Sequence, residues 1–405
     1  MPNNFLLSII IPTKNREKYA VKVVEQILQM HDENIQVVIQ DNSDTDNLSS
    51  LLNIYKNDIR LKYNYSSGIL SFIENFNKAI EMADGEYLCL IGDDDGILPQ
   101  MIEVVKWAQK NSIDAIKPSL SVVYFWPNSE ILKGCKDDGY LVINKISQTI
   151  KIIDPYMQVE KLMEQGAQRY LDLSMVKLYH GIVRRNCLNE IKNITGKFIG
   201  GLTPDIYISV ALSVTINCLV ELDFPLTISG ICNKSGSADS VTGRHTGLLE
   251  EAPHLKGHQN YYWSKLIPRF YSVETIWADS AISALNDLNQ QNLVHKFNLL
   301  ALSSNCLIKY PQFKNIILDN IYKNIGTKNS FKIHLELLAF KNSAINLLTR
   351  VIKRLLRKNI DVFKINNINN IIEAEKIAQI WFTQKNININ NVIQKLENSN
   401  KAHDG

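Results

Sequence analysis

The start of the chain alternates between strand and helix patterns. A continuous apolar run covers residues 6–11, a helical pattern begins near Glu17, and a second apolar run covers residues 35–40. Continuous apolar runs are typical of strands buried on both faces, as in a parallel sheet covered by helices. Two such strands joined by a helix form a βαβ unit. The sequence therefore predicts an α/β fold with a mostly parallel sheet.

Three adjacent carboxylates follow a strand pattern over residues 87–91. They are Asp93, Asp94 and Asp95, with a glycine on each side. Open α/β sheets bind ligands at the carboxyl ends of their strands. Three neighbouring carboxylates repel one another, and a bound cation would relieve that repulsion. The flanking glycines permit sharp turns and a close approach to a ligand. An acidic surface turn is the alternative interpretation.

The rest of the chain divides into two parts. Helix patterns cover residues 48–56, 69–83, 99–110 and 186–193, and strand patterns cover residues 59–63, 114–117, 121–125, 176–183 and 218–230. Asp84-Gly85 is predicted to cap the helix that ends at residue 83. Strand patterns disappear after residue 260. We therefore expect an α/β domain over residues 1–260, with halves at about 1–118 and 119–260, and a mainly α-helical C-terminal region over residues 261–405.

Composition narrows the classes of function. A formal net charge of +3 argues against a nucleic-acid partner. The six cysteines are dispersed, with no C-x-x-C pair, and are predicted to be buried free thiols in a reducing compartment. We find no signal-peptide pattern at the start of the sequence and no apolar run near the ~20 residues that span a bilayer. We expect a cytoplasmic protein.

Three motifs together resemble those of family 2 glycosyltransferases with the GT-A fold. They are SIIIPTKNR at residues 8–16, VVIQDNSD at residues 37–44 and NFNKAIEMADGEYLCLIGDDD at residues 75–95, followed by Leu98-Pro99. The resemblance covers about the first 100 residues closely and continues more loosely to about residue 260. It implies a Rossmann-like sheet and an inverting, hexosyltransferase-type enzyme. The implied donor is a nucleotide-sugar, with a UDP-sugar favoured.

The resemblance assigns donor-binding roles to residues near the first strand ends. Asp41 corresponds to the acid that accepts a hydrogen bond from the base, with a turn or N-cap aspartate as the alternative. Pro12, Thr13 and Arg16 correspond to residues that line the nucleoside. Arg16 could also pair with phosphate or with Asp41. Asn75 corresponds to a polar residue near the nucleotide, or is a surface asparagine.

The three carboxylates are expected to contact a divalent cation and the donor. Transfer expels a nucleoside diphosphate, and Mn²⁺ or Mg²⁺ would stabilise its growing charge as a Lewis acid. By resemblance, Asp93 contacts the ribose or donor sugar, and Asp94 and Asp95 lie in the metal region. The metal ligands that we expect are Asp93, Asp95 and His245. The division of roles stays open, because a run of three acids leaves the alignment ambiguous by one residue.

Inverting transfer also needs a base that removes the proton of the acceptor hydroxyl. The family places an aspartate at a helix start, and Asp205 is the candidate here, preceded by Thr203 as N-cap and Pro204 in the first turn. A helix N-terminus lowers the pKa of a carboxylate, so partial burial must compensate if Asp205 is the base. A plain helix-start acid is the alternative. Three other acids are substitute candidates: Asp172, Glu221 and Asp223.

Further candidates are a long loop and two residues on the acceptor side. The loop over residues 236–245 ends in Arg244 and His245. GT-A enzymes often close such a loop over the donor, with a basic residue or a histidine on the diphosphate or metal; a solvated loop is the alternative. His180 is a candidate acceptor contact or a core histidine. Tyr207 is a candidate for the acceptor side or the loop.

Residues 344–358 form an amphipathic helical pattern with an apolar face and a basic face. A basic amphipathic helix can lie on an anionic membrane surface. It can equally pack its apolar face on the domain or on a second subunit. If the helix binds membrane, the expected location includes the inner face of the plasma membrane. If it packs on a second subunit, the protein is a homo-oligomer.

We therefore expect a metal-dependent inverting glycosyltransferase. Its expected acceptor is a hydroxyl of a bacterial surface glycan or glycolipid, in capsule, lipopolysaccharide or teichoic acid assembly. A sugar-phosphate nucleotidyltransferase is one alternative, although PTKNR at residues 12–16 lacks the glycines of that class. A non-catalytic scaffold or sugar-binding domain is the other, and the intact acid cluster argues against it.

Overall fold

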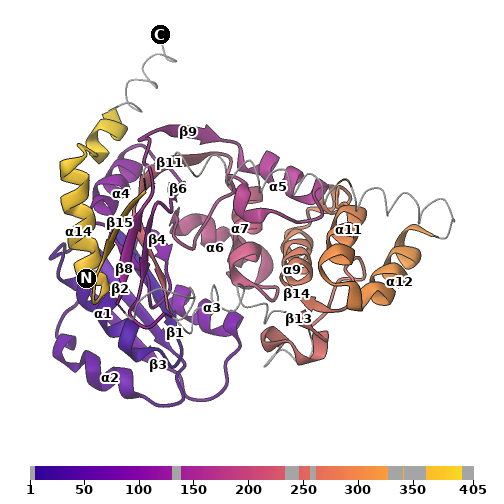
Figure 1. Cartoon of the computed structure of the whole chain (residues 1–405), viewed down its shortest axis with the longest axis horizontal. Helices are drawn as coiled ribbons and strands as arrows, with labels where there is room; N and C mark the ends of the chain where they lie inside the picture. Colours follow the sequence, from indigo (N-terminus) through magenta and orange to yellow (C-terminus); the bar gives the residue numbers. More distant parts are fainter. Residues whose placement is uncertain are drawn as a thin grey trace, which may run out of the picture.

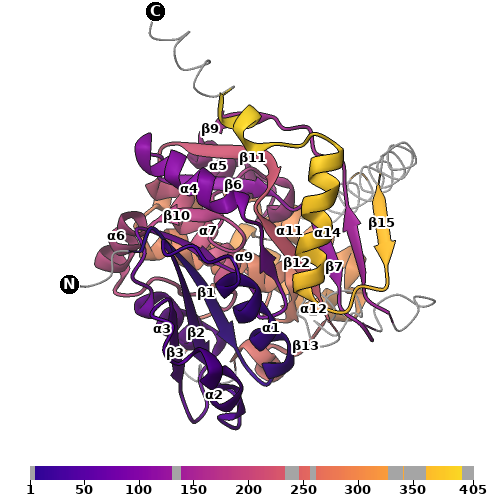
Figure 2. The ribbon, with the colours of Figure 1, turned by 90° about the vertical axis from the view of Figure 1, so that its left-hand side faces the viewer.

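The structure, a computed structural model, describes most of the chain and shows two sheets covered by helices (Figures 1 and 2). The described residues are 5–129, 138–232, 246–255, 261–326, 341 and 362–394.

The larger sheet confirms the predicted fold class. Within the described residues its order is β3-β2-β1-β4-β10-β6-β11-β9. The pairs β1–β2, β1–β4, β2–β3 and β6–β11 are parallel, whereas β10 runs antiparallel to both of its neighbours and β9 runs antiparallel to β11. The strands are β1 (Leu7–Thr13), β2 (Ile35–Asp41), β3 (Leu61–Tyr65), β4 (Tyr87–Leu90), β6 (Ala115–Ser119), β9 (Ile150–Ile153), β10 (Ile182–Arg184) and β11 (Leu219–Pro225).

A second sheet lies beside the first in the order β15-β8-β7-β12-β5. Its strands are β5 (Gly96–Ile97), β7 (Val122–Phe125), β8 (Tyr140–Ile143), β12 (Thr227–Ile231) and β15 (Phe363–Asn366), and a separate pair joins β13 (Thr246–Gly247) to β14 (Tyr271–Ser272). The chain passes from β6 into β7 and from β11 into β12. This sheet brings β12 next to the segment that follows β4, through the pairing of β12 with β5.

The described helices lie on the two faces of the larger sheet, on the second sheet or on other helices. They are α1 (Glu17–Leu28), α2 (Asn47–Leu52), α3 (Phe72–Met82), α4 (Gln100–Lys110), α5 (Pro155–Glu164), α6 (Arg185–Thr195), α7 (Pro204–Thr215), α9 (Val273–Asp287), α10 (Gln291–Val294), α11 (Leu299–Lys309), α12 (Lys314–Ile325) and α14 (Ile371–Gln384). Successive strand side chains point to opposite faces. Ile9 and Ile11 of β1 therefore enter the core under α1 and α4, and Ile10 enters the core under α3 and α7.

The C-terminal region is mainly helical, as predicted, but its last described segment returns to the start of the chain. Figure 1 shows α14 beside α1, on the opposite side of the molecule from α11 and α12. Strand β15 pairs with β8, which corrects the expectation that strands end before residue 260. Ile371 and Phe382 are buried in the same core as β1 and α1. The domain boundary near residue 260 stays a prediction.

Local differences from the predicted elements have physical causes. Helix α3 ends at Met82 with an extended Ala83, so Gly85 is not its left-handed cap. A Cβ on Gly85 would lie 2.6 Å from the Ser8 backbone nitrogen, so this glycine permits close packing on β1. Of the strand predicted over residues 176–183, only the end lies in a strand, β10. The described cysteines form no disulfide, but Cys218 is exposed and Cys187 is partly exposed rather than buried.

Candidate active site

The three carboxylates lie at the carboxyl edge of the parallel strands, as the sequence predicts. Asp93, Asp94 and Asp95 follow β4, and each is at most 3% exposed. We call residues 92–95 the acid loop. Since β1 and β2 run parallel to β4, their last residues, Thr13 and Asp41, end at the same edge. The parallel sheet thus gathers polar groups from three segments of the chain.

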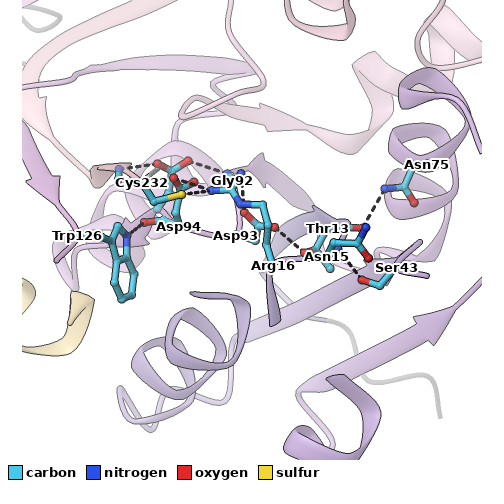
Figure 3. A network of polar contacts seen from close by, with 12 residues as sticks. Thr13, Asn15, Arg16, Ser43, Asn75, Gly92, Asp93, Asp94, Trp126 and Cys232 are labelled. Carbon is cyan, nitrogen blue, oxygen red and sulfur yellow. Dashed lines mark hydrogen bonds and ion pairs between the residues drawn. The ribbon is translucent and has the colours of Figure 1, made fainter. Parts of the chain in front are cut away.

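Arg16 is the cation that faces the acid loop in this structure (Figure 3). Its guanidinium nitrogens lie 3.1 Å from Asp93 Oδ1 and 2.7 Å from Asp94 Oδ2. The Thr13 hydroxyl donates to Asp93 Oδ2 at 2.5 Å, and Arg16 also donates to Cys232 Sγ at 2.9 Å. The predicted alternative in which Arg16 pairs with Asp41 is therefore corrected: its partners are the carboxylates of the acid loop.

Burial and mutual repulsion shift the pKa values in the acid loop. Burial raises the pKa of Asp93 to about 6, with Arg16 and Thr13 acting against it and Asp95 adding to it. Burial, and then Asp95, raise the pKa of Asp94 to about 7. Burial lowers the pKa of Arg16, but Asp93 and Asp94 more than offset this and hold it above its ordinary value. The mutual repulsion expected from the sequence is therefore present, and one arginine relieves part of it.

Asp95 faces the other way and is surrounded by donors. Its Oδ1 accepts from the Gly230 backbone N–H at 2.7 Å. Its Oδ2 accepts from the Gly92 N–H at 2.6 Å and from the Tyr179 hydroxyl at 3.0 Å, and lies 3.3 Å from His180 Nε2. A Cβ on Gly230 would lie 1.7 Å from the Asp94 backbone oxygen, so only glycine permits this contact between β12 and the acid loop.

The other donor-side candidates lie at the same edge. Asp41 is fully buried and its Oδ1 accepts from the Ser43 N–H at 2.8 Å and hydroxyl at 2.5 Å, while its Oδ2 accepts from the Tyr63 hydroxyl at 3.1 Å. Pro12 is the buried penultimate residue of β1. Asn75 of α3 donates to the Thr13 backbone oxygen at 3.4 Å, and its buried Oδ1 has no hydrogen-bond partner in the part of the chain that the structure describes. Their predicted contacts with a nucleotide stay predictions.

The candidate base begins α7, where the sequence predicted a helix start. Thr203 is the N-cap residue and Pro204 the first helical residue. The Thr203 hydroxyl makes no capping bond, and it is buried without a hydrogen-bond partner among the described residues. Burial raises the pKa of Asp205, although the backbone N–H of Ile206, the charge of Lys177 and its own backbone N–H lower it. Desolvation thus outweighs the helix start, which is the compensation a base at this position needs.

The substitute bases are engaged in other contacts. Glu221 of β11 accepts from Lys117 Nζ at 2.6 Å and from the Ser174 hydroxyl, and its pKa is lowered: burial raises it, but the Lys117 and Ser174 contacts outweigh burial. Asp223 accepts from the backbone and hydroxyl of Ser147. Asp172 forms an ion pair with Arg169 at 2.9 Å.

The two acceptor-side candidates are buried. His180 is 6% exposed, its Nδ1 lies 2.9 Å from the Thr227 hydroxyl, and burial lowers its pKa although Asp95 raises it. The Tyr207 hydroxyl donates to Asp287 of α9 at 2.6 Å. Both make the contacts of satisfied core side chains, and their contact with an acceptor stays a prediction.

Some predictions fall outside what the structure describes. Arg244, His245 and the helix predicted over residues 344–358 lie outside the described residues. Within the described part of the chain, no group of three or more His, Cys, Asp or Glu side chains is arranged to hold a metal ion. No helix in that part is long and apolar enough to cross a membrane.

Several site residues were missed from the sequence. Trp126 donates from Nε1 to the Asp94 backbone oxygen at 2.8 Å, and Cys232, Tyr179 and Gly230 also contact the acid loop or Arg16. None of these belongs to a motif, and each comes from a distant segment. Lys177, beside Asp205, did leave a signal: it is a lone charge in the otherwise apolar run MVKL at residues 175–178.

The family comparison matches the part of the chain that forms this edge. Residues 8–131 match the model of glycosyl transferase family 2. The abequosyltransferase RfbV of Salmonella typhimurium is 27% identical over 64% of this chain and 75% of that enzyme. The GalNAc(5)-diNAcBac-PP-undecaprenol beta-1,3-glucosyltransferase of Campylobacter jejuni is 31% identical over 23% of this chain and 30% of that enzyme.

The remaining comparisons cover less of the relative or show lower sequence identity. The chain spans less than half the length of other curated relatives that it matches, for example 38% of glycosyltransferase GlyG of Streptococcus pneumoniae. Among solved structures, S. aureus TarS 1-349 in complex with UDP-GlcNAc has a TM-score of 0.43 and 13% identity, over 80% of this chain and 93% of that chain. The family match and the curated relatives show that the first part of the chain is similar to glycosyltransferases of family 2.

Proposed function

We propose that the protein transfers a sugar from a nucleotide-diphosphate donor, preferably a UDP-sugar, to a hydroxyl of a bacterial surface glycan or lipid-linked glycan, with inversion at the anomeric carbon. The observation that carries the proposal is the arrangement of Thr13, Arg16, Asp93 and Asp94 at the carboxyl edge of the parallel strands. The names of the relatives support the acceptor class, because one is a glucosyltransferase named for a PP-undecaprenol compound and another is an abequosyltransferase.

The donor would lie along the ends of β1, β2 and β4. Asp41 would accept a hydrogen bond from the base, and the unpartnered Oδ1 of Asn75 offers an acceptor to the nucleotide. Arg16 would place positive charge beside the leaving diphosphate, since its guanidinium already lies against two carboxylates. Charge-assisted hydrogen bonds from arginine to phosphate are strong and geometrically specific.

Asp93 and Asp94 fit a divalent cation better than Asp95 does. Asp94 Oδ2 is buried and lies 2.7 Å from the Arg16 guanidinium, and among the described residues it accepts no hydrogen bond. The Asp94 carboxyl group also has a side-chain contact with the Cys232 thiol. Both oxygens of Asp95 already accept from protein donors. Mn²⁺ or Mg²⁺, when bound, would stabilise the charge on the leaving diphosphate. We therefore assign the cation to Asp93 and Asp94, with His245 as a further predicted ligand, and assign Asp95 to holding the acid loop.

Asp205 would act as the general base. As the acceptor oxygen bonds to the anomeric carbon, its proton passes to the Asp205 carboxylate. The bond from that carbon to the diphosphate oxygen breaks, and its electron pair leaves with the diphosphate. Burial makes Asp205 a stronger base than an ordinary aspartate, whereas Glu221 is held ionised by Lys117.

The proposal is tested by incubating the full chain with a panel of nucleotide-sugars and Mn²⁺ or Mg²⁺, and measuring nucleoside diphosphate release. We expect release and thermal stabilisation with one UDP-sugar, both lost in EDTA and both restored by added metal. Full release in EDTA would contradict the metal assignment. Binding without release by any donor, even with lipid-linked glycan acceptors, would favour a non-catalytic sugar-binding domain.

A further inference from the structure

A lysine is buried close to the candidate base. Lys177 lies between η2 (Tyr170–Asp172) and β10, and its Nζ is buried without a hydrogen-bond partner among the described residues. Buried polar groups are nearly always hydrogen-bonded, and a buried ammonium is costly when it is left alone. A leucine or methionine would cost less at this position, so the charge of Lys177 needs a reason.

One aromatic ring links this lysine to α7. Lys177 Nζ lies 3.1 Å from the centroid of the Tyr170 ring, a cation–π contact that favours the charged amine. The Tyr170 hydroxyl donates to the backbone oxygen of Asp205 at 3.4 Å. Trp277 of α9 packs edge-on against Tyr170, with ring centroids 5.4 Å apart. Tyr170 is therefore fixed between the lysine and the first turn of α7.

The charged groups that face Lys177 come from two elements. Burial lowers the pKa of Lys177 well below its ordinary value, Asp205 of α7 acts to raise it, and Lys117 of β6 lowers it further. Lys117 already has a carboxylate partner, since its Nζ lies 2.6 Å from Glu221 Oε1. Lys177 and Asp205 both contact Tyr170, so among the described residues Asp205 is the carboxylate that balances Lys177.

We propose that Lys177 is a positioning residue that keeps the Asp205 carboxylate ionised for proton abstraction. The inference rests on the proposed role of Asp205 as the base. Desolvation favours the protonated form of a carboxyl group, which cannot accept a proton. A nearby ammonium favours the ionised form. Because its Nζ is buried, Lys177 would act through Asp205, without touching the acceptor.

The test compares the pH dependence of kcat/KM in wild type, Lys177→Met and Lys177→Arg. Activity on the acid side of the profile requires ionised Asp205, so loss of the ammonium should move that limb to higher pH. Lys177→Met should lose several-fold more activity at about pH 6 than at about pH 8, with the donor KM unchanged. Lys177→Arg keeps the charge and should restore the limb toward its wild-type position.

Lys197→Met is the matched control. Lys197 lies near the same helix but pairs with Asp287 at 3.0 Å and is 42% exposed. Its profile should match wild type. A loss that is equal at every pH in Lys177→Met, or no loss, overturns the inference. If Lys177→Met does not fold, Lys177→Gln is measured in the same way.

Asp205→Asn separates the two proposals. If Asp205→Asn keeps wild-type turnover, the base assignment fails and the inference about Lys177 fails with it. If Asp205→Asn is inactive but the acid limb of Lys177→Met stays in place, only the inference about Lys177 fails.

Discussion

Asp94 and Asp95 are neighbours in the chain, yet their carboxylates lie in opposite environments. Asp95 has both oxygens bonded by donors from the acid loop, β12 and Tyr179. Asp94 has a buried oxygen that lies against the charge of Arg16 and accepts no hydrogen bond among the described residues, and the Cys232 thiol is a further contact of its carboxyl group. A fully bonded carboxylate holds a fold together, whereas a buried carboxylate with spare lone pairs is a place where a ligand gains energy. The two environments fit the two proposed roles, with Asp95 holding the acid loop in place and Asp94 binding the cation.

Two basic side chains differ in a similar way. Arg16 lies in direct contact with two carboxylates of the acid loop, whereas Lys177 Nζ has no hydrogen-bond partner among the described residues. The contacts of Arg16 suit the binding of a charged ligand. The position of Lys177 suits its proposed role of keeping Asp205 ionised as the base.

The largest effect is expected at Asp94. Asp94→Asn removes the charge that we assign to the cation, so transfer should fall by at least about 10³-fold, and Mn²⁺ should no longer strengthen donor binding. The measurements are turnover and calorimetric donor titration with and without Mn²⁺. The exposed Asp319→Asn is the control and should behave as wild type. Wild-type metal dependence in Asp94→Asn would return the metal role to Asp95.

The next largest effect is expected at Asp205. Asp205→Asn keeps the size of the side chain but cannot accept a proton, and loss of a general base costs ~10²–10⁴-fold in rate. Donor affinity should hardly change, because the base faces the acceptor. Single-turnover rates with a working acceptor give the measurement. If chemistry runs at the wild-type rate in the variant, another carboxylate is the base, with Glu221 or Asp223 next.

Asp95→Asn should act mainly on stability. Asp95 accepts hydrogen bonds from Gly92, Tyr179 and Gly230, and the amide has a single oxygen to accept them, so the free energy of unfolding should fall by about 3 kcal/mol. Urea unfolding of Asp95→Asn and Asp94→Asn side by side checks this, since only Asp95→Asn should shift the midpoint downward. If Asp95→Asn is stable but no longer binds Mn²⁺, Asp95 is a metal ligand, as first predicted from the sequence, and is not mainly structural.

The smallest effect concerns pH. Burial raises the pKa of Asp94 from 3.8 to about 7, so between these values the folded protein binds more protons than the unfolded chain. Stability of the metal-free protein should therefore fall as the pH rises through this window and level off above it. Asp94→Asn should flatten part of this slope, which shifts the melting temperature by a few degrees above neutral pH. An identical slope in both proteins would show that Asp94 is ionised throughout.

Local pattern in the sequence was enough to predict most elements of the first part of the chain. The apolar runs that became β1 and β2, the helical spacing of α1 and the start of α7 each depend on neighbours within a few residues. Such patterns report which face of an element is buried. The carboxyl edge followed from them, because parallel strands end together, whereas the assignment of Thr13 and Asp41 to the site came from the family resemblance.

Tertiary structure alone decided which distant residues contact the candidate site. Asp95 meets Gly230 across 135 residues of sequence and Tyr179 across 84, so nothing local could distinguish it from Asp94. Likewise β15 and α14 lie beyond residue 360 in the sequence but pack beside the first strands and helices of the chain. Lys177 contacts Tyr170 only because η2 and α7 pack together. Periodicity determines what is buried, but desolvation and hydrogen-bond satisfaction depend on distant groups, and these decide which carboxylate of the acid loop is fully bonded and which is not.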